Sequence, residues 1–363
     1  MTGLGRFIVS KLINTLITLA VALLLISSIF AVYSVKEKQA AVQEEFVFVA
    51  KQLEQKYKDP EELQEALKKL KEGLMARYGI TGSFYKDVIS EIKKQLISII
   101  TFDFGTSRNR YFGTNDIGEQ VKIALKNTMI LFTTATIITS IVGILLGLYM
   151  ARRPGGLLDR IVSILGMVSW SFPTWWVGIL LLIIFSFYLD IFPTQSKDVY
   201  AALQAIPPDL PTLTRIYLEI KTWLYYMALP LITLVSVSIG GWAYLVRNLV
   251  LEVMHQDFVL AARARGLPEK RVVYGHVLRT SSPPIVTYVA LSLVGSFGGA
   301  IISETVFGWP GMGLLYWVAL RNGETTVVTA TTSVVTLVFI LTVLLLDFIY
   351  MLLDPRIRTE KTG

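Results

Sequence analysis

Six stretches of the chain lack Lys, Arg, Asp and Glu and are rich in apolar residues. They cover residues 12–33, 127–151, 161–189, 222–246, 280–303 and 325–346, and their lengths are 22, 25, 29, 25, 24 and 22 residues. Roughly 20 residues of α-helix cross a hydrocarbon core about 30 Å thick. The pattern therefore predicts an all-α membrane protein with six transmembrane helices in a lipid bilayer.

The region between the first two stretches follows a different pattern. Apolar residues recur at helical spacing from Val42 to Tyr57, stop at Asp59-Pro60 and resume at Leu63. Asp59 is a good helix N-cap, and proline suits the first helical position. We expect a helical hairpin over residues 36–78, inside an extracytoplasmic helical segment that covers residues 34–115.

Breaks occur in two apolar regions. Ser171-Phe172-Pro173 lies inside the third stretch, where proline removes a backbone hydrogen bond and predicts a kink. The segment 307–320 is interrupted by glycines and by Pro310, so it cannot cross the membrane as one helix. We expect it to form a turn that dips back at the external face.

The distribution of basic residues orients the spans. Segments 1–11, 152–160, 247–279 and 347–363 hold 2, 3, 6 and 3 Lys or Arg, whereas the short segments 190–221 and 304–324 hold 3 and 1. Short loops rich in Lys and Arg remain in the cytoplasm. We therefore predict that both termini are cytoplasmic and that the chain lies in the cell (inner or plasma) membrane.

Composition excludes several kinds of chemistry. The chain has no cysteine and two histidines, and it contains no HExxH, GxSxG or Gly-Lys sequence. Thiolate sites, zinc-protease sites and a Walker A phosphate loop are thus excluded, and the chain does not hydrolyse ATP by itself. We expect no enzymatic activity, cofactor or metal. The net charge of +7 reflects topology, so no nucleic-acid partner is expected.

The cytoplasmic segment 252–279 is too long for a simple turn. Residues 257–265 read as a short alanine-rich helix that Gly266 terminates, because glycine is favoured just beyond a helix C-terminus. Pro268 then begins a second short helix. The sequence predicts a helical elbow that could insert into a groove of another protein.

Several motifs in this part of the chain resemble a known family. Ala261, Ala262 and Gly266 occupy the AA and G positions of the motif EAAxxxG, and residues 261–279 resemble its peptide-transport version. Residues 304–313 match an ExxFxxPGxG element, 353–358 an LDPR terminus, 103–107 a DFGxS segment, and Ser171-Phe172-Pro173 with Trp176 an SxPxFW-like segment. These residues resemble the permease subunits of binding-protein-dependent ABC importers, in the dipeptide/oligopeptide/nickel branch.

The resemblance covers residues from about 80 to 358 and the first span, and it implies a type I ABC importer permease fold. It divides the chain into a tail and first span (1–33), the extracytoplasmic segment (34–115), a five-helix permease core (116–358) and a C-terminal tail (359–363). It implies as partners a second permease, two ATP-binding subunits and an extracytoplasmic solute-binding protein. The loop 252–279 would couple the chain to the ATPase through Asp257, Ala261, Ala262, Arg265, Gly266 and Leu267.

Dipeptides or oligopeptides are the expected cargo, with oligosaccharides and nickel as alternatives. A stand-alone ion-coupled carrier is a further alternative, although the charge-free spans lack the ionisable residues that such carriers usually need.

Residues at the end of the fifth stretch and in the segment after it are candidates for a pathway or an outer gate. They are Gly295, Gly298, Gly299, Glu304, Trp309 and Pro310. Small residues also permit tight helix crossing, which is the expected role of Gly143 and Gly147 in the second stretch. For Glu304 we favour a position at the membrane interface over a gating role.

Overall fold

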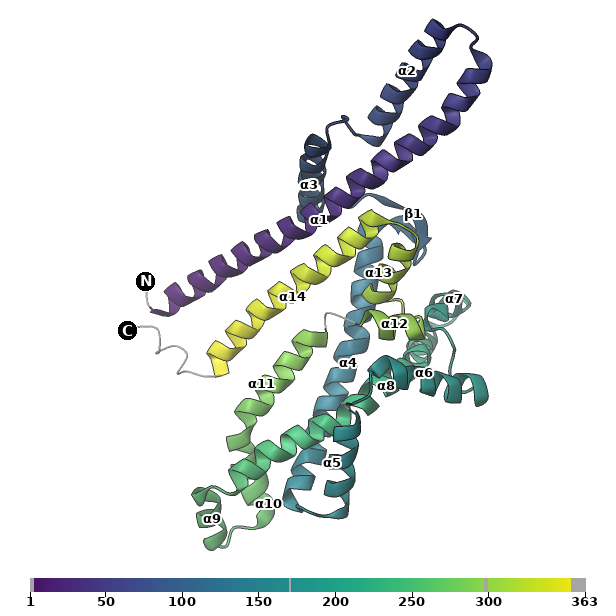
Figure 1. Cartoon of the computed structure of the whole chain (residues 1–363). Coiled ribbons are helices and arrows are strands. Elements are labelled where there is room, and N and C mark those ends of the chain that lie inside the picture. The colour runs from purple at the N-terminus through teal and green to yellow at the C-terminus, as the bar shows by residue number, and fades with distance from the viewer. Residues whose placement is uncertain (1–2, 170, 297–299, 354–363) are drawn as a thin grey trace.

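The computed structural model describes residues 3–169, 171–296 and 300–353 (Figure 1). The predicted pathway residues Gly298 and Gly299, most of the LDPR motif from Asp354 onward and the tail 359–363 lie outside these ranges. The longer helices are α1 (Gly3–Lys56), α2 (Pro60–Tyr78), α3 (Phe84–Thr101), α4 (Ile117–Arg152), α5 (Leu157–Ser169), α8 (Thr212–Met254), α11 (Leu278–Ser296), α13 (Met312–Arg321) and α14 (Thr325–Leu353). The shorter helices are α6 (Thr174–Leu182), α7 (Val199–Gln204), α9 (Asp257–Ala264), α10 (Glu269–Arg271) and α12 (Ile301–Phe307).

The predicted helical hairpin is present, and its first arm continues the first span without a break. α1 is 54 residues long and extends from the apolar run to Lys56. Asp59 caps α2 by accepting a hydrogen bond from the Glu61 backbone N–H, and Pro60 is the first helical residue, as predicted. α2 then packs back on α1 through a small apolar cluster around Val42 and Leu74.

A two-stranded antiparallel hairpin follows α3 and is the exception to the all-helical prediction. β1 (Thr106–Tyr111) pairs with β2 (Thr114–Asp116) through a two-residue turn in which Phe112 and Gly113 both have positive φ. Such turns favour glycine because it has no Cβ. The strands are short and polar, and they are held by a distant residue: Glu324 accepts hydrogen bonds from the backbone N–H groups of Arg108 and Asn109.

Several predicted spans are confirmed. Within the described ranges, four helices are long and apolar enough to cross a membrane: α1, α4, α8 and α14. A fifth candidate pairs α5 with α6 and the π-helical segment Ile183–Tyr188, at an angle of 102° beside the predicted break at Pro173. α11 falls in the predicted fifth stretch but does not meet the same test, because its first half is polar and contains Pro283 and Pro284. The count of six spans therefore stays a prediction.

Glycines allow α8 to lie directly against its neighbours. A Cβ on Gly147 of α4 would come within 2.7 Å of the Ala243 carbonyl oxygen, and one on Gly166 of α5 within 2.6 Å of the Gly240 carbonyl oxygen. Gly143 is equally tight against Trp242. The predicted packing role of Gly143 and Gly147 is confirmed, and α4 and α8 form the frame that carries the loop 252–279.

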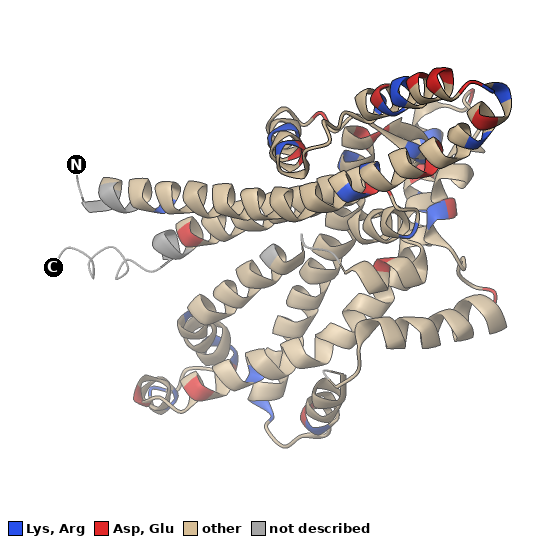
Figure 2. Ribbon diagram, turned by 45° about the horizontal axis from the view of Figure 1, so that its top comes forward, with Lys and Arg blue, Asp and Glu red and all other residues tan. Residues whose placement is uncertain are grey.

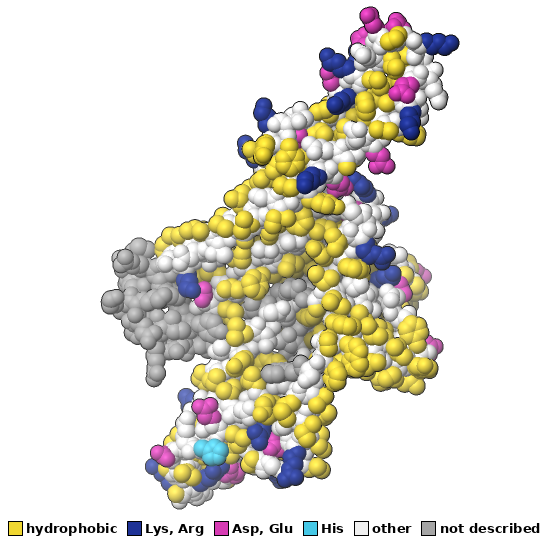
Figure 3. All heavy atoms as spheres, in the orientation of Figure 1, with side chains coloured by type: hydrophobic (Ala, Val, Ile, Leu, Met, Phe, Trp, Pro, Cys, Tyr) yellow, Lys and Arg dark blue, Asp and Glu magenta, His cyan; other side chains and the backbone are white. Residues whose placement is uncertain are grey.

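Charged side chains gather at two opposite ends of the molecule. One group lies on α2 and the outer half of α1, and the other lies on α9, α10 and the turn between α4 and α5 (Figure 2). The surface between them is dominated by apolar side chains (Figure 3). This arrangement is the one expected of a protein whose middle is covered by lipid.

Candidate functional site

The predicted elbow is present, and hydrogen bonds fix its shape. α9 ends in a Schellman motif, in which Gly266 has φ 75° and donates to the Arg263 carbonyl while Leu267 donates to the Ala262 carbonyl. Only glycine adopts this left-handed conformation without strain. Pro268 then caps α10, and its carbonyl accepts hydrogen bonds from Arg271 and Val272. The chain therefore reverses direction at one defined residue.

The elbow is attached to the helices behind it by a buried apolar cluster. Val259 of α9 and Val272 of the following π-helical segment (Val272–Val277) are fully buried in this cluster. It also contains Leu148, Ala151, Val246, Val250, Val253, Ala262, Val273, Val277 and Ile285. Because protein interiors are close-packed, a force applied to the elbow is transmitted to the ends of α4, α8 and α11 that pack on it.

The predicted coupling residues fall into two groups. Asp257, Ala261, Arg265 and Gly266 are exposed on the outer surface of the elbow. Ala262 is 7% exposed and packs inward, and Leu267 is half-buried against the same apolar cluster. The first group is exposed and can contact a partner protein, whereas Ala262 and Leu267 pack the elbow against the rest of this chain.

Sequence reasoning missed two surface residues of the elbow. Phe258 is 38% exposed and Leu260 is 58% exposed, although both are large and apolar. With Ala261 they give α9 an outward apolar face. The available signal was helical phase: once Val259 and Ala262 are known to face inward, the residues beside them must face outward.

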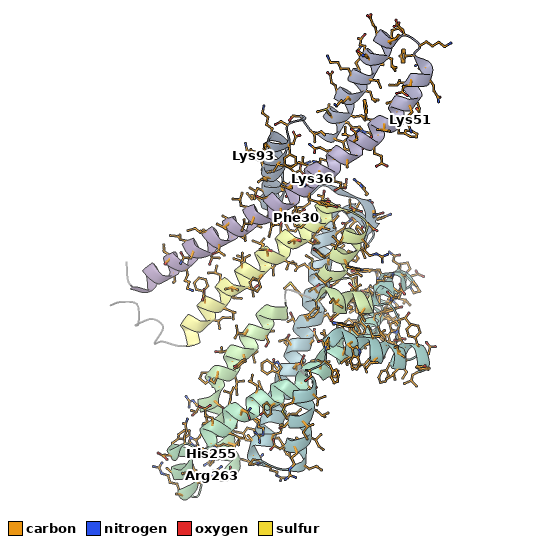
Figure 4. All side chains as sticks on the ribbon, viewed as in Figure 1. Phe30, Lys36, Lys51, Lys93, His255 and Arg263 are labelled. Carbon is orange, nitrogen blue, oxygen red and sulfur yellow. The ribbon has the colours of Figure 1, made fainter. Side chains whose placement is uncertain are left out.

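One ion pair bridges the two arms of the elbow. The Arg263 guanidinium donates to both carboxylate oxygens of Glu269, at 2.8 and 3.2 Å. This hydrogen bond lowers the pKa of Glu269 against the opposing effect of desolvation. The bridge is therefore intact at neutral pH and is lost only as pH falls through the lowered pKa. Arg263 lies with His255 at the end of the molecule formed by the elbow (Figure 4). Because both partners are partly exposed, we expect the pair to contribute less than about 1 kcal/mol.

A second, more buried ion pair braces the adjacent turn. Asp159 of α5 is 5% exposed and accepts two hydrogen bonds from Arg247 of α8, through Nε and Nη2. The same carboxylate accepts from the backbone N–H of Gly155 at 2.8 Å. The pair joins the α4–α5 turn to the helix that leads into the elbow.

Replacing Arg247 with alanine should destabilise this end of the molecule by about 2 kcal/mol, because the buried Asp159 carboxylate loses the two hydrogen bonds from Arg247. Thermal unfolding of the purified assembly measures the effect. Adding Asp159→Asn to the same variant should recover part of the loss. If the double variant is no more stable than the single variant, the brace does not have this role.

Away from the elbow, Glu304 of α12 holds together the turn predicted over 307–320. Its carboxylate accepts from the Thr128 hydroxyl at 2.8 Å and from the backbone N–H groups of Gly313 and Leu314 at 2.7 and 3.3 Å. The glutamate thus caps the N-terminus of α13 from α12. Its side chain is 1% exposed, so the protein itself surrounds the carboxylate, and the expected position at the membrane interface stays a prediction. The orphan N–H groups of α13 need an acceptor, and Glu304 supplies it.

Trp309 and Pro310 are fixed by Asn127 of α4. The Trp309 indole donates to the Asn127 carbonyl at 3.1 Å, and the Asn127 amide donates to the Pro310 carbonyl at 2.8 Å and to the Tyr200 hydroxyl at 2.7 Å. Trp309 is fully buried. α12 ends at Gly308, which has φ 59°, and α13 begins at Met312, so the predicted interruption of this segment is confirmed.

Gly295 borders a cavity within the apolar zone. The cavity has a volume of about 280 Å³ and lies between α4, α8 and α11. Its polar lining consists of hydroxyl side chains without any charge, those of Thr136, Thr139, Ser238, Ser292 and Ser296. Phe132, Leu234 and Trp242 supply much of the apolar lining. A Cβ on Gly295 would meet nothing within 4 Å, so helix crossing does not require this glycine.

The model of the binding-protein-dependent transport system inner membrane component family matches residues 143–359. The chain belongs to this family. The match includes both the elbow and the Glu304 turn, and the resemblance stated from the motifs is confirmed. As a family member, this permease is a multi-pass membrane component of a transport system.

Curated relatives agree with the assignment. The oligopeptide transport system permease protein AppB of Bacillus subtilis is 28% identical over 79% of this chain and 85% of its own length. The dipeptide transport system permease proteins DppB of Escherichia coli K12 and of Lactococcus lactis are 29% and 30% identical, over 64% and 72% of this chain and 71% and 77% of their own lengths. A chain from inward-facing structures of the MetNI methionine ABC transporter aligns with a TM-score of 0.46 and 17% identity, over 65% of this permease and 97% of that chain. The family assignment rests on the sequence matches.

Proposed function

We propose that this permease moves dipeptides or oligopeptides into the cell, as one transmembrane subunit of an ABC importer. The names of the relatives AppB and DppB support the class of substrate. The observation that carries the proposal is the outward apolar face of α9 on an elbow that is packed rigidly against α4, α8 and α11. Such a face fits a groove on a separate ATP-binding subunit.

In this scheme ATP is hydrolysed outside the chain, which performs no catalysis itself. Phe258, Leu260 and Ala261 enter the groove of the ATPase, while Asp257 and Arg265 contact its rim. Gly266 sets the angle of the elbow, and Ala262 and Leu267 keep it attached to the spans. Closure of the ATPase pair then moves the elbow, and the differential contacts of the two states shift the spans between inward-open and outward-open forms.

The hydroxyl-lined cavity beside Gly295 supports a position for the pathway between α4, α8 and α11. Uncharged hydroxyls can donate to and accept from the peptide backbone, which all peptides share, so such a surface tolerates side chains of either charge. Gly298 and Gly299, which follow Gly295 closely in the sequence, stay predicted residues of this pathway. The buried group of Glu304, Trp309 and Pro310 would frame the outer mouth without lining it.

The complete importer would contain a second permease, two ATP-binding subunits and an extracytoplasmic solute-binding protein. Both termini and the elbow would face the cytoplasm, which agrees with the excess of Lys and Arg in these segments over the short segments 190–221 and 304–324.

Reconstitution tests the function directly. The permease, assembled with the other subunits in proteoliposomes, should accumulate labelled dipeptides or oligopeptides when ATP is inside and the loaded binding protein is outside. Labelled oligosaccharides and nickel are the matched alternative cargoes. Uptake driven by an ion gradient in the absence of the ATP-binding subunits would contradict the proposal and favour a stand-alone carrier.

A further inference from the structure

Helix α3 carries an exposed apolar stripe that the transport function does not explain. Tyr85, Ile89, Ile97 and Ile100 are 80%, 56%, 61% and 82% exposed. Their spacing, with Lys93 between Ile89 and Ile97, places them along one side of the helix. The helix precedes the region matched by the permease family, which begins at residue 143.

The opposite side of α3 is well packed, so the helix cannot turn to hide the stripe. Ile99 is 8% exposed and lies in the main apolar cluster. Asp87 is 4% exposed and accepts hydrogen bonds from the Thr81 backbone N–H and hydroxyl at 2.8 and 2.7 Å. The orientation of the stripe away from the protein is therefore fixed.

Contacts with α1 set the height of α3 relative to the bilayer. Glu91 accepts hydrogen bonds from Lys38 at 2.7 Å and from Ser34 at 3.2 Å, at the end of the apolar run of α1. Figure 1 shows α3 beside α1, with its C-terminal end at α1 and its N-terminal end toward α2. The residues after Glu91 therefore lie at the level where the apolar surface of α1 begins. On α1 this surface includes Ile29, which is 68% exposed.

The sequence at this level has the composition of a membrane-embedded segment. Residues 95–102 contain no charge, and the exposed Lys93 and Lys94 directly precede them. The hydroxyls of Ser98 and Thr101 each donate to the backbone carbonyl four residues earlier, both at 2.9 Å, so they need no water. Lysines beside an apolar helix end extend their ammonium groups to the phosphate level of lipids.

We propose that α3 lies in the outer surface of the bilayer, with Ile97 and Ile100 among the acyl chains and Tyr85, Lys93 and Lys94 among the headgroups. The apolar stripe thus contacts the phospholipid of the outer leaflet, which is continuous with the lipid that covers Ile29 of α1. In this position α3 anchors the base of the α1–α2 hairpin and fixes its height above the membrane.

Site-directed spin labelling tests the position, and the natural absence of cysteine makes single labels straightforward. Ile97→Cys and Ile100→Cys are labelled in the assembled transporter in phospholipid vesicles, and collisions with oxygen and with a water-soluble nickel chelate are compared. Ile29→Cys is the lipid control, and Lys71→Cys on exposed α2 is the water control. We expect the α3 labels to match the Ile29 label, with an oxygen-to-nickel ratio at least about threefold that of the Lys71 label, because oxygen concentrates in hydrocarbon and the chelate does not.

Two results would overturn the proposal. Nickel access equal to that of the Lys71 label would place the stripe in water. Exclusion of both oxygen and nickel would show that protein covers it. Ile100 is 82% exposed, and Ile97 borders a cavity of about 750 Å³ between α3, α1 and α14, so neither substitution disturbs the packed face around Ile99. Neither result depends on which substrate the transporter carries.

Discussion

Replacing Gly266 with valine should reduce ATP-driven uptake by about tenfold or more while the permease still folds and assembles. The reason is local: Gly266 has φ 75°, and a residue with a Cβ costs about 1–2 kcal/mol in that region, more when it is β-branched. No atom lies within 4 Å of the Cβ position, so the penalty comes from backbone strain alone. The strained elbow shifts to another angle, and α9 no longer presents its apolar face to the ATPase.

Uptake and ATP hydrolysis are measured together in proteoliposomes. Hydrolysis in the Gly266→Val variant should continue at a basal rate but no longer respond to the loaded binding protein. Gly275→Val is the matched control, because Gly275 lies in the same loop without a positive φ and with only the flexible Arg271 side chain nearby. Uptake by Gly266→Val equal to that of the control variant would refute the role of the elbow.

Replacing Glu304 with leucine should destabilise the folded permease by about 4 kcal/mol, since it removes the acceptor of two buried hydrogen-bond donors and one partly buried donor. The donors are the Thr128 hydroxyl and the backbone N–H groups of Gly313 and Leu314. Glu304→Gln keeps one acceptor oxygen and should cost less. The thermal midpoint of the purified assembly reports the difference.

Glu219→Leu is a suitable control for Glu304, because Glu219 forms a surface pair with Arg215 and holds no buried donor. Its thermal midpoint should stay near that of the unchanged protein. Equal stability of Glu304→Leu and Glu219→Leu would show that the α13 N-terminus finds another acceptor.

Local signals in the sequence predicted a large part of the fold. The charge-free stretches of α1, α4, α8 and α14, the cap at Asp59 and the turn at Gly266 each depend on residues close together in the chain. The hairpin β1–β2 was missed because Glu324, more than 200 residues away, holds it. The capping role of Glu304 was missed for a similar reason, since its partner Thr128 lies on another helix.

The elbow shows which features of a motif can be predicted from the sequence and which depend on the tertiary packing of its side chains. The sequence identified the loop and its bend, but it could not separate Ala261, which faces outward, from Ala262, which packs on the spans. That distinction depends on the rotation of α9 about its axis, which the buried side chains of Val259 and Val272 determine. The same rotation exposes Leu260, which occupies the position where the family motif has glutamate.

Cross-linking at the outer face of α9 tests the central claim most directly. A photoreactive label on Ala261→Cys, in the assembled and active transporter, should cross-link to the ATP-binding subunit in high yield. The same label on Arg153→Cys, exposed in the neighbouring α4–α5 turn, should give little product. Absence of a cross-link from Ala261, in a preparation that still transports, would contradict the role of the elbow as the contact with the ATPase.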